Sequence, residues 1–519
     1  MLAVASLLAS TTIATGQGQW QDQWLEVRSR HFTVVSNAGE EEARSVSRDL
    51  ERARAAFEAT LEEIRLDPRQ PVVVLALDDE AGLRELLPQF WDRKGARPAA
   101  AYWPGPHQHH IAVRTDLSSD LRAQHLLHEY VHLLTELNSP DPPAWLDEGL
   151  SELYGTAVIA KETMEVGRPA VQHLQVLRSR RRWIPLDELL AMKRAPDAAD
   201  ADRVSMFYGQ SWALAHCLML GDCLEPFDFA QDEEAGHDGN PEAGHDGFRE
   251  TGRERGPEAG PGVLRPQFAP MGFAAQLRQG ADPVEAARLA FGDLAVLEQA
   301  LKAYVQTGRF RAVRLGTSGP AALDFARARN EETNDFEAAE LRVLSPAEAL
   351  AIRAQALLDG ERPAAALPLL TEALALDANA GPVLETMGRL YFQENAPAEA
   401  ATWFDRAIAS GQATHLAHYY RAILARTLQD ASPTSEEDHL RRAIALDETF
   451  APAYARLAAT LARHHRPTNV DADRARMIEA LALARRATEL EPDNAGYWVE
   501  LGTRLLAVNP VVPFLQSVR

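Results

Sequence analysis

The stretch His128-Glu129-Tyr130-Val131-His132 decides which fold is expected for the first half of this chain. It has the pattern H-E-x-x-H and lies in a run of helical character from Asp120 to Leu137. Residues four apart lie on one face of a helix, so the two imidazoles are spaced to share one Zn²⁺. Glu129 is placed beside the first ligand, where a carboxylate takes a proton from a water on such a metal.

The following segment supplies a third ligand. A catalytic zinc site uses three protein ligands and keeps one position open for water. The sequence Pro143-Ala144-Trp145-Leu146-Asp147-Glu148-Gly149-Leu150-Ser151-Glu152 comes after a Pro-rich turn over 138–143 and opens a second helical stretch. A helix–turn–helix brings Glu148 back over His128 and His132, so the pattern predicts a His₂Glu site. For the short motif alone, an exposed helix that carries two histidines by chance remains the alternative.

H-E-Y-V-H followed by W-L-D-E-G-L-S-E-L-Y resembles the gluzincin metallopeptidases. Within that group the chain most resembles the bacterial peptidase MA-like proteins, which are often joined to tetratricopeptide repeats. The resemblance covers residues 24–310 and implies an α+β metallopeptidase domain with one Zn²⁺ as cofactor. It implies that the metal ligands are His128, His132 and Glu148, and that Glu129 is the general base. It also implies that Glu152 orients a ligand imidazole, because a ligating histidine needs its other N–H held by an acceptor.

A second element of the resemblance is Phe207-Tyr208-Gly209-Gln210-Ser211-Trp212. It is similar to the tyrosine-bearing helix start of the aminopeptidase branch, which implies that the Tyr208 hydroxyl stabilises the oxyanion of the reaction. The alternative is a packing residue at a helix start. No G-x-M-E-N-type element precedes the zinc helix, and residues 99–113 instead predict a turn followed by a strand at the edge of the active site. An endopeptidase or a narrow processing enzyme is therefore as consistent with the sequence as an aminopeptidase.

Other histidines offer competing sites. His125 is one turn before His128, but three ligands in a line along one helix surround a tetrahedral metal poorly. His107, His109 and His110 are expected at the edge of the active site or in an exposed loop.

Composition and charge restrict the classes of function and cellular location that the chain can have. The chain has 519 residues and a formal net charge of −22, which argues against nucleic-acid and anionic-membrane binding. It contains no run of eighteen apolar residues, so no transmembrane helix is expected. Residues 1–16 resemble a signal-peptide core without a basic n-region, and we expect a periplasmic, envelope-associated or secreted protein. In such a compartment Cys217 and Cys223 form one disulfide, whereas two half-buried thiols are the alternative.

Changes in pattern along the chain suggest its domains. Residues 24–115 predict strands around 31–35 and 71–77 with a long helix between them, and residues 120–225 are mainly helical. Residues 226–267 are rich in Gly, Pro and acidic side chains, and we expect a disordered insertion there. Helices resume over 268–310 and close the catalytic domain, and residues 311–344 are expected to be a linker.

Residues 345–510 contain an internal period. Small residues recur at a step of 34: Ala354, Ala366 and Ala373 return as Gly388, Ala400 and Ala407, and Ala422, Ala443, Ala458 and Ala487 continue the series with small insertions. This period resembles tetratricopeptide repeats and implies an all-α solenoid that holds a peptide or protein partner.

Two functions follow as hypotheses. The first is zinc-dependent hydrolysis of peptide bonds, with Glu129 as general base and the substrate or partner held by the repeats. The second is a non-catalytic repeat scaffold whose peptidase-like domain is inactive. The intact set of ligands and base favours the first, because a scaffold has no chemical need for Glu129.

Overall fold

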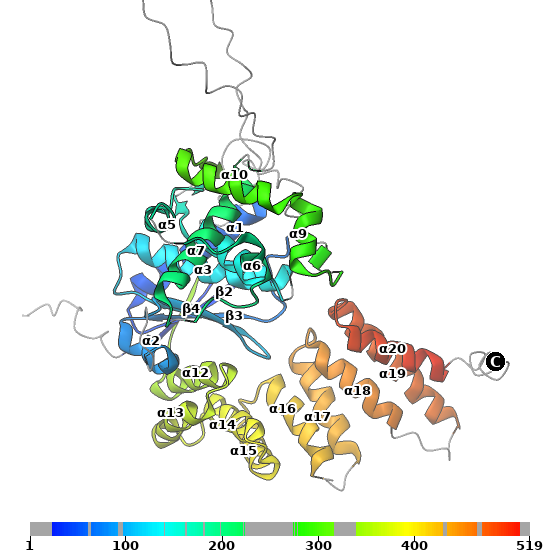
Figure 1. The fold of residues 1–519 in the computed structure, drawn as a ribbon. Helices are drawn as coiled ribbons and strands as arrows, with labels where there is room; N and C mark the ends of the chain where they lie inside the picture. Colours follow the sequence, from blue (N-terminus) through cyan, green and yellow to red (C-terminus); the bar gives the residue numbers. More distant parts are fainter. Residues whose placement is uncertain are drawn as a thin grey trace, which may run out of the picture. The chain divides into compact units, whose positions relative to one another are not determined.

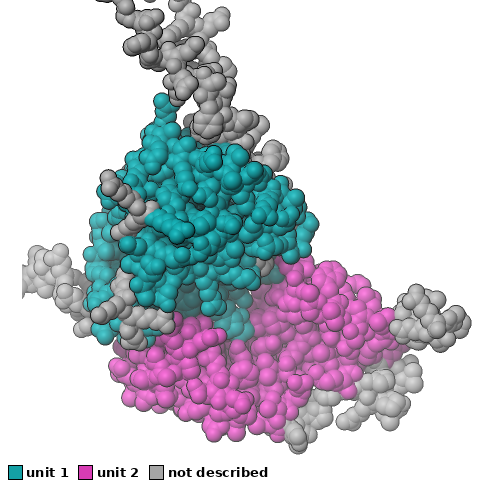
Figure 2. Space-filling view, viewed as in Figure 1, with its two compact units in different colours: residues 1–343 teal, residues 344–519 magenta. Residues whose placement is uncertain are grey.

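The chain divides into two compact units, Met1–Val343 and Leu344–Arg519 (Figure 2). The computed structural model describes residues 23–60, 64–91, 97–139, 141–160, 163–179, 182–197, 199–221, 223, 273, 276–277, 279–315, 339–428, 433–463 and 470–508. The expected signal peptide at 1–16 and the expected insertion at 226–267 lie outside these residues. Among the described helices, none is both long and apolar enough to cross a membrane.

The first unit is built on a mixed sheet with the strand order β4-β5-β3-β2-β1-β9 (Figure 1). β2, β3 and β5 are parallel, whereas β1 pairs antiparallel with β2 and β9, and β4 pairs antiparallel with β5. The continuous apolar run of β3 is buried in the middle of the sheet, as its composition predicts. The six strands are β1 (Leu25–Arg28), β2 (Phe32–Ser36), β3 (Val72–Leu77), β4 (Ala100–Pro104), β5 (His109–Arg114) and β9 (Glu340–Val343).

Two long helices, α1 (Glu40–Thr60) and α3 (Ser119–Asn138), pack beside this sheet. The Ser118 side chain caps α3 by accepting a hydrogen bond from the Leu121 N–H. Tyr130, in the middle of H-E-Y-V-H, is 1% exposed and makes edge-to-face contact with Phe32 of β2 at 5.5 Å between ring centroids. This buried aromatic contact fixes the rotation of α3, so the two histidines of the motif face away from the sheet core.

The rest of the first unit is mainly helical. α4 packs against both α3 and α7, so it lies between these two long helices. The elements are α2 (Glu80–Leu86), a 3₁₀ turn η1 (Pro88–Phe90), α4 (Ala144–Gly155), α5 (Val171–Leu177), α6 (Leu186–Ala191), α7 (Ala201–Leu220), α9 (Pro283–Phe291) and α10 (Leu294–Thr307). A small second sheet joins β6 (Val158–Ile159), β7 (Met164–Val166) and β8 (Val313–Leu315).

Two expectations from the sequence need correction. Residues 311–344 are not simply a linker, because β8 belongs to the small sheet and β9 pairs with β1 at the edge of the large one. Both strands are short and largely exposed, so they lack the apolar pattern by which strands are recognised. Residues 99–113 form a hairpin of two strands, β4 and β5, rather than a turn and one strand.

The second unit consists of helices that pair with their neighbours along the chain (Figure 1). The alanines of the 34-residue series are all 0% exposed, so the period marks the positions where paired helices pack closely, as predicted. The helices are α12 (Pro346–Asp359), α13 (Pro363–Leu376), α14 (Gly381–Gln393), α15 (Pro397–Ala409), α16 (His415–Thr427), α17 (Pro433–Leu446), α18 (Ala451–Arg463), α19 (Val470–Leu490) and α20 (Ala495–Val508).

Candidate metal centre

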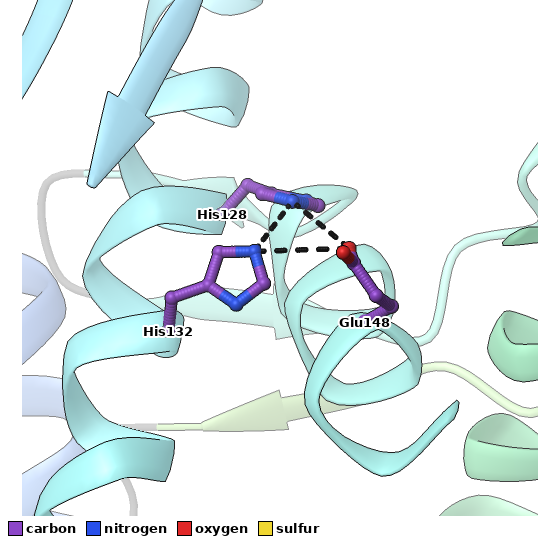
Figure 3. Close-up of side chains that lie close together, drawn as sticks. All are labelled: His128, His132 and Glu148. Atoms are coloured by element: carbon purple, nitrogen blue, oxygen red, sulfur yellow. Dashed lines mark hydrogen bonds and ion pairs between the residues drawn. The ribbon is translucent and has the colours of Figure 1, made fainter. Parts of the chain in front are cut away.

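His128, His132 and Glu148 converge, with the histidines on α3 and the carboxylate on α4 (Figure 3). The two histidine Nε2 atoms are 3.1 Å apart, and Glu148 Oε2 lies 3.8 Å from His128 Nε2 and 3.7 Å from His132 Nε2. Each of the three side chains keeps 16–19% of its surface exposed, so water reaches the group. Within the described part of the chain, no other group of three ligand-type side chains comes together in this way.

The spacing of these atoms fits a tetrahedral zinc ion. Two ligand atoms held about 2.1 Å from a tetrahedral metal are roughly 3.4 Å apart. The observed separations of 3.1, 3.7 and 3.8 Å bracket that value, so small side-chain movements suffice to enclose an ion. The donor set of two imidazoles and one carboxylate is also one that zinc uses in catalytic sites.

The close packing of α4 against α7 brings Glu148 to the histidines. A Cβ atom at Gly149 would lie only 2.5 Å from the carbonyl oxygen of Ser211 on α7. Only glycine allows this approach of the two helices, which explains the glycine directly after Glu148. Gly155, at the end of α4, similarly faces α3, where an added Cβ would meet His128 Cβ at 3.2 Å.

Asp147 forms a hydrogen bond with the ring nitrogen of His132 that faces away from Glu148. Its Oδ1 is 2.9 Å from His132 Nδ1, and Ser151 Oγ lies 3.2 Å from the same nitrogen. In the neutral form of His132, an N–H at Nδ1 donates to the carboxylate and leaves the Nε2 lone pair directed toward Glu148 and His128. The sequence pattern did not single out Asp147 or Ser151, although both are within one turn of Glu148 on the same helix.

The surroundings set the charge of each ligand. Burial and the neighbouring His132 lower the pKa of His128 to about 4, so its imidazole is neutral at pH 7. Burial alone would lower the pKa of His132, but the hydrogen bond to Asp147 and nearby carboxylates raise it to about 9. Burial raises the pKa of Glu148 to about 7. A divalent cation would be favoured here, because it would stabilise the deprotonated forms of Glu148 and His132.

Glu129 lies near the edge strand of the sheet. Burial raises the pKa of its carboxyl group to about 7, although His132 and the nearby backbone of Tyr102 in β4 favour the charged form. The Tyr102 hydroxyl lies 2.9 Å from His109 Nδ1 and donates to Glu136 Oε2 at 2.8 Å. These two contacts fix the position of the Tyr102 side chain. A carboxylate whose pKa lies near neutrality suits a group that takes up and returns a proton.

Tyr208 reaches the group from α7. Its hydroxyl donates to Glu148 Oε1 at 3.4 Å, and burial together with the Glu148 charge raises its pKa, so the phenol stays protonated. The expected helix start at Tyr208 is wrong, because α7 begins at Ala201 and is capped by Asp200. The predicted proximity to the ligands is nevertheless present.

Glu152 lies one turn after Glu148, but its hydrogen bond runs to His173 Nε2 on α5 at 2.9 Å rather than to a ligand imidazole. The expected hydrogen bond is therefore made by Asp147, to His132, while Glu152 acts on His128 only through its charge. Burial would raise the pKa of Glu152, yet the His173 hydrogen bond and the surrounding histidines lower it overall. No motif marks His173, which lies on a separate short helix.

The competing histidines do not join the ligand group. His125 is near enough to Glu152 to feel its charge but is not part of the converging set. His109 and His110 are 5% and 0% exposed on β5, so of the two alternatives expected from the sequence the exposed loop is wrong for both. Their position in a strand inside the sheet accounts for this burial.

The C-terminal end of α7 is anchored by two features. Cys217 and Cys223 form a disulfide, one of the two states expected from the sequence. His216, fully buried, lies with Nε2 2.9 Å from the Gly167 carbonyl oxygen and Nδ1 2.8 Å from the Tyr304 hydroxyl. Both contacts suit a neutral imidazole that donates through Nε2 and accepts at Nδ1, and burial lowers the His216 pKa accordingly.

Comparisons with known proteins concern the repeats. Residues 357–427 match the family described as tetratricopeptide repeat, and no curated protein matches the chain. Among solved structures, the chain is similar to YrrB, a TPR protein with an unusual peptide-binding site (22% identity, 35% of this chain, 81% of that chain, TM-score 0.26). It is also similar to a thermophilic TPR protein of Thermus thermophilus (21% identity, 36% of this chain, 90% of that chain, TM-score 0.24). A third similar structure is the type IV pilus biogenesis factor PilW (21% identity, 38% of this chain, 91% of that chain, TM-score 0.23).

The family match spans α13 to α16 and falls within the part of the second unit where buried alanines recur at the predicted step. The C-terminal region of this chain is therefore composed of tetratricopeptide repeats.

Proposed function

We propose that this protein is a zinc-dependent hydrolase of peptide bonds, a member of the gluzincin type that the sequence resembles. The convergence of His128, His132 and Glu148 beside a partly buried Glu129 is the observation that carries the proposal. A structural metal site has no need of a carboxylate whose pKa is raised to about 7 next to its ligands, whereas hydrolysis does.

A zinc ion on these three ligands would lower the pKa of a water to about 7 and polarise a carbonyl group. Glu129 would take the proton of the attacking water and return it to the leaving amine. The nearby Tyr102 backbone favours the charged form of this carboxylate. Tyr208, protonated and directed at Glu148, would donate to the negative charge that develops on the carbonyl oxygen.

The edge strand supports a peptide as the substrate. β4 lies at one edge of the large sheet, and the backbone of its Tyr102 is close enough to Glu129 to affect the pKa of that carboxyl group. Extended peptides bind to proteins by adding a strand to such an edge. A substrate paired along β4 would pass beside the general base.

The repeats would then supply selectivity. Tetratricopeptide repeats stack helix pairs into extended surfaces that bind other proteins. We infer that the second unit recruits the substrate protein or a partner that presents it. Export to the periplasm, the envelope or the medium agrees with the disulfide between Cys217 and Cys223.

The second candidate function is a scaffold without catalysis. It is favoured by the comparisons, since the matched family is that of the repeats and residues 357–427 lie wholly in the second unit. In that case the first unit would be a folded support, and binding of partners would be unaffected by changes at Glu129.

The test combines metal analysis with peptide cleavage. Zinc-loaded wild type, Glu129→Gln, Glu148→Ala and the control Glu58→Gln would each be incubated with a diverse peptide mixture, and new termini identified by mass spectrometry. We expect one zinc in all but Glu148→Ala, and cuts only by the wild type and the control, whose exposed carboxylate is on α1. One bound zinc without any cuts in wild type supports the scaffold, and zinc that survives Glu148→Ala contradicts the assigned ligands.

A further inference from the structure

Tyr102 connects three elements beside the candidate metal centre. It lies on β4, an outermost strand of the large sheet, and its hydroxyl donates to Glu136 Oε2 of α3 at 2.8 Å. The same hydroxyl lies 2.9 Å from Nδ1 of His109 on β5. Burial lowers the His109 pKa to about 4, so its neutral imidazole can donate to the phenol oxygen while the phenol donates to the carboxylate.

The position of Glu136 brings this connection next to the candidate ligands. Glu136 lies one turn after His132 on α3, so its hydrogen bond ties the edge strand to the same helix one turn away. Burial raises the pKa of the Tyr102 phenol, and the charges of Glu136 and Asp147 raise it further. The phenol is therefore protonated at pH 7 and keeps its role as a donor.

The backbone of β4 shows what this side chain would hold in place. At one end of the β4–β5 pair the Arg114 N–H donates to the Ala99 carbonyl oxygen at 3.0 Å, and at the other end the Gly105 N–H makes the matching bond at 2.9 Å. In an antiparallel pair, residues alternate between bonding the neighbouring strand and pointing away from it. In this register the N–H and C=O groups of Ala100 and Tyr102 therefore point away from β5, toward the outer edge of the sheet.

We propose that Tyr102 is a positioning residue whose hydroxyl holds the outer edge of β4 at a fixed distance from the helix that carries His128 and His132. The inference rests on the proposed hydrolysis, because an extended peptide substrate would pair with the outward groups of Ala100 and Tyr102. A displacement of about 1 Å between a substrate and the catalytic groups can cost about a hundredfold in rate. A hydrogen bond from the edge strand to α3 limits such a displacement.

Hydrogen exchange followed by mass spectrometry tests the connection in the full chain without any need for turnover. Tyr102→Phe removes only the hydroxyl, and we expect the amides of β4 to exchange about tenfold faster, because a hydrogen bond to a charged group is lost. Glu136→Gln keeps an acceptor oxygen and should exchange nearly as the wild type does. Glu136→Ala should exchange as Tyr102→Phe does.

Tyr304→Phe is the matched control. It also removes a phenol hydroxyl that lies 2.8 Å from a histidine Nδ1, in this case that of His216. Tyr304 is on α10, which packs against α6, α7 and α9, so its loss should leave the exchange of β4 unchanged even if the Tm falls.

Cleavage of fluorescein-labelled casein by the zinc-loaded proteins tests the role of Tyr102 in the reaction. We expect Tyr102→Phe to bind one zinc and to lose about tenfold in kcat/KM, mainly through kcat, because a displaced substrate is bound but reacts slowly. Tyr304→Phe should keep the kcat/KM of the wild type. A merely structural loss would affect both variants alike.

Three results would overturn the proposal. These are unchanged exchange of β4 in Tyr102→Phe, an equal acceleration in Tyr304→Phe, and wild-type kinetics in a Tyr102→Phe protein whose β4 exchanges faster. Loss of zinc from Tyr102→Phe would also contradict it, because the residue would then support the ligands and not the edge strand. If the wild type cuts no casein, the proposed hydrolysis fails, while the exchange rates still decide whether Tyr102 holds β4 against α3.

Discussion

Gly149→Ala tests whether the contact between α4 and α7 builds the metal centre. The added Cβ would lie 2.5 Å from the Ser211 carbonyl oxygen, 0.5 Å closer than the 3.0 Å below which real Cβ contacts are essentially never found. The helices must separate, and overpacking of this kind costs about 1–3 kcal/mol. Alanine regains about 1 kcal/mol of helix propensity, so the net loss is roughly 0–2 kcal/mol. For a unit of this size that lowers the Tm by at most about 8 °C.

The same movement shifts Glu148 and Tyr208 relative to each other, so zinc binding should weaken together with stability. Differential scanning calorimetry and a competitive zinc titration measure the two effects. Gly502→Ala is the matched control, because that helical glycine has no atom within 4 Å of an added Cβ and should tolerate the change or gain stability. If Gly149→Ala is as stable as wild type and binds zinc equally well, the tight α4–α7 contact does not position the ligands.

Three further outcomes are expected. Asp147→Ala should weaken zinc affinity about tenfold or more in a competition titration, because His132 loses its hydrogen-bond acceptor. Asp147→Asn keeps an acceptor for His132 and should lose less affinity. Equal zinc affinity in both variants and wild type would contradict the supporting role of Asp147. The pKa of His216 is lowered, so the unfolded chain binds a proton that the folded chain does not, and the free energy of unfolding should fall as pH drops below about 6.5. Urea titrations at several pH values should show a shallower fall in His216→Gln, and identical slopes would contradict this account. Replacing Cys217 and Cys223 by serine should cost about 2 kcal/mol in the same assay, because the disulfide closes a short loop.

Local pattern was sufficient to predict that the three candidate ligands converge. A spacing of four on a helix places His128 and His132 on one face whatever the rest of the chain does, so their adjacency was predictable from the sequence. Glu148 was predictable from the following helix, since a short turn leaves an antiparallel helix little freedom. The 34-residue recurrence of small side chains likewise predicted which alanines are buried in the second unit.

Partners from distant segments were not predictable. Asp147 takes the supporting contact expected of Glu152, because the rotation of α4 about its own axis is set by the packing of Gly149 on α7. Tyr102 and His173 meet the site from a strand and a short helix that carry no motif. Strands β8 and β9 were missed because an exposed edge strand has no apolar alternation by which to recognise it.

The sequence by itself therefore determined the positions that depend on neighbours along the chain: the H-E-x-x-H face, the approach of Glu148 to it, and the alanine series of the repeats. Helical periodicity is a local property, and it survives any arrangement of the remaining elements. Tertiary structure alone decided which carboxylate supports His132 and which strand lies near Glu129. These depend on distances between segments far apart in sequence, which packing sets and no local pattern encodes.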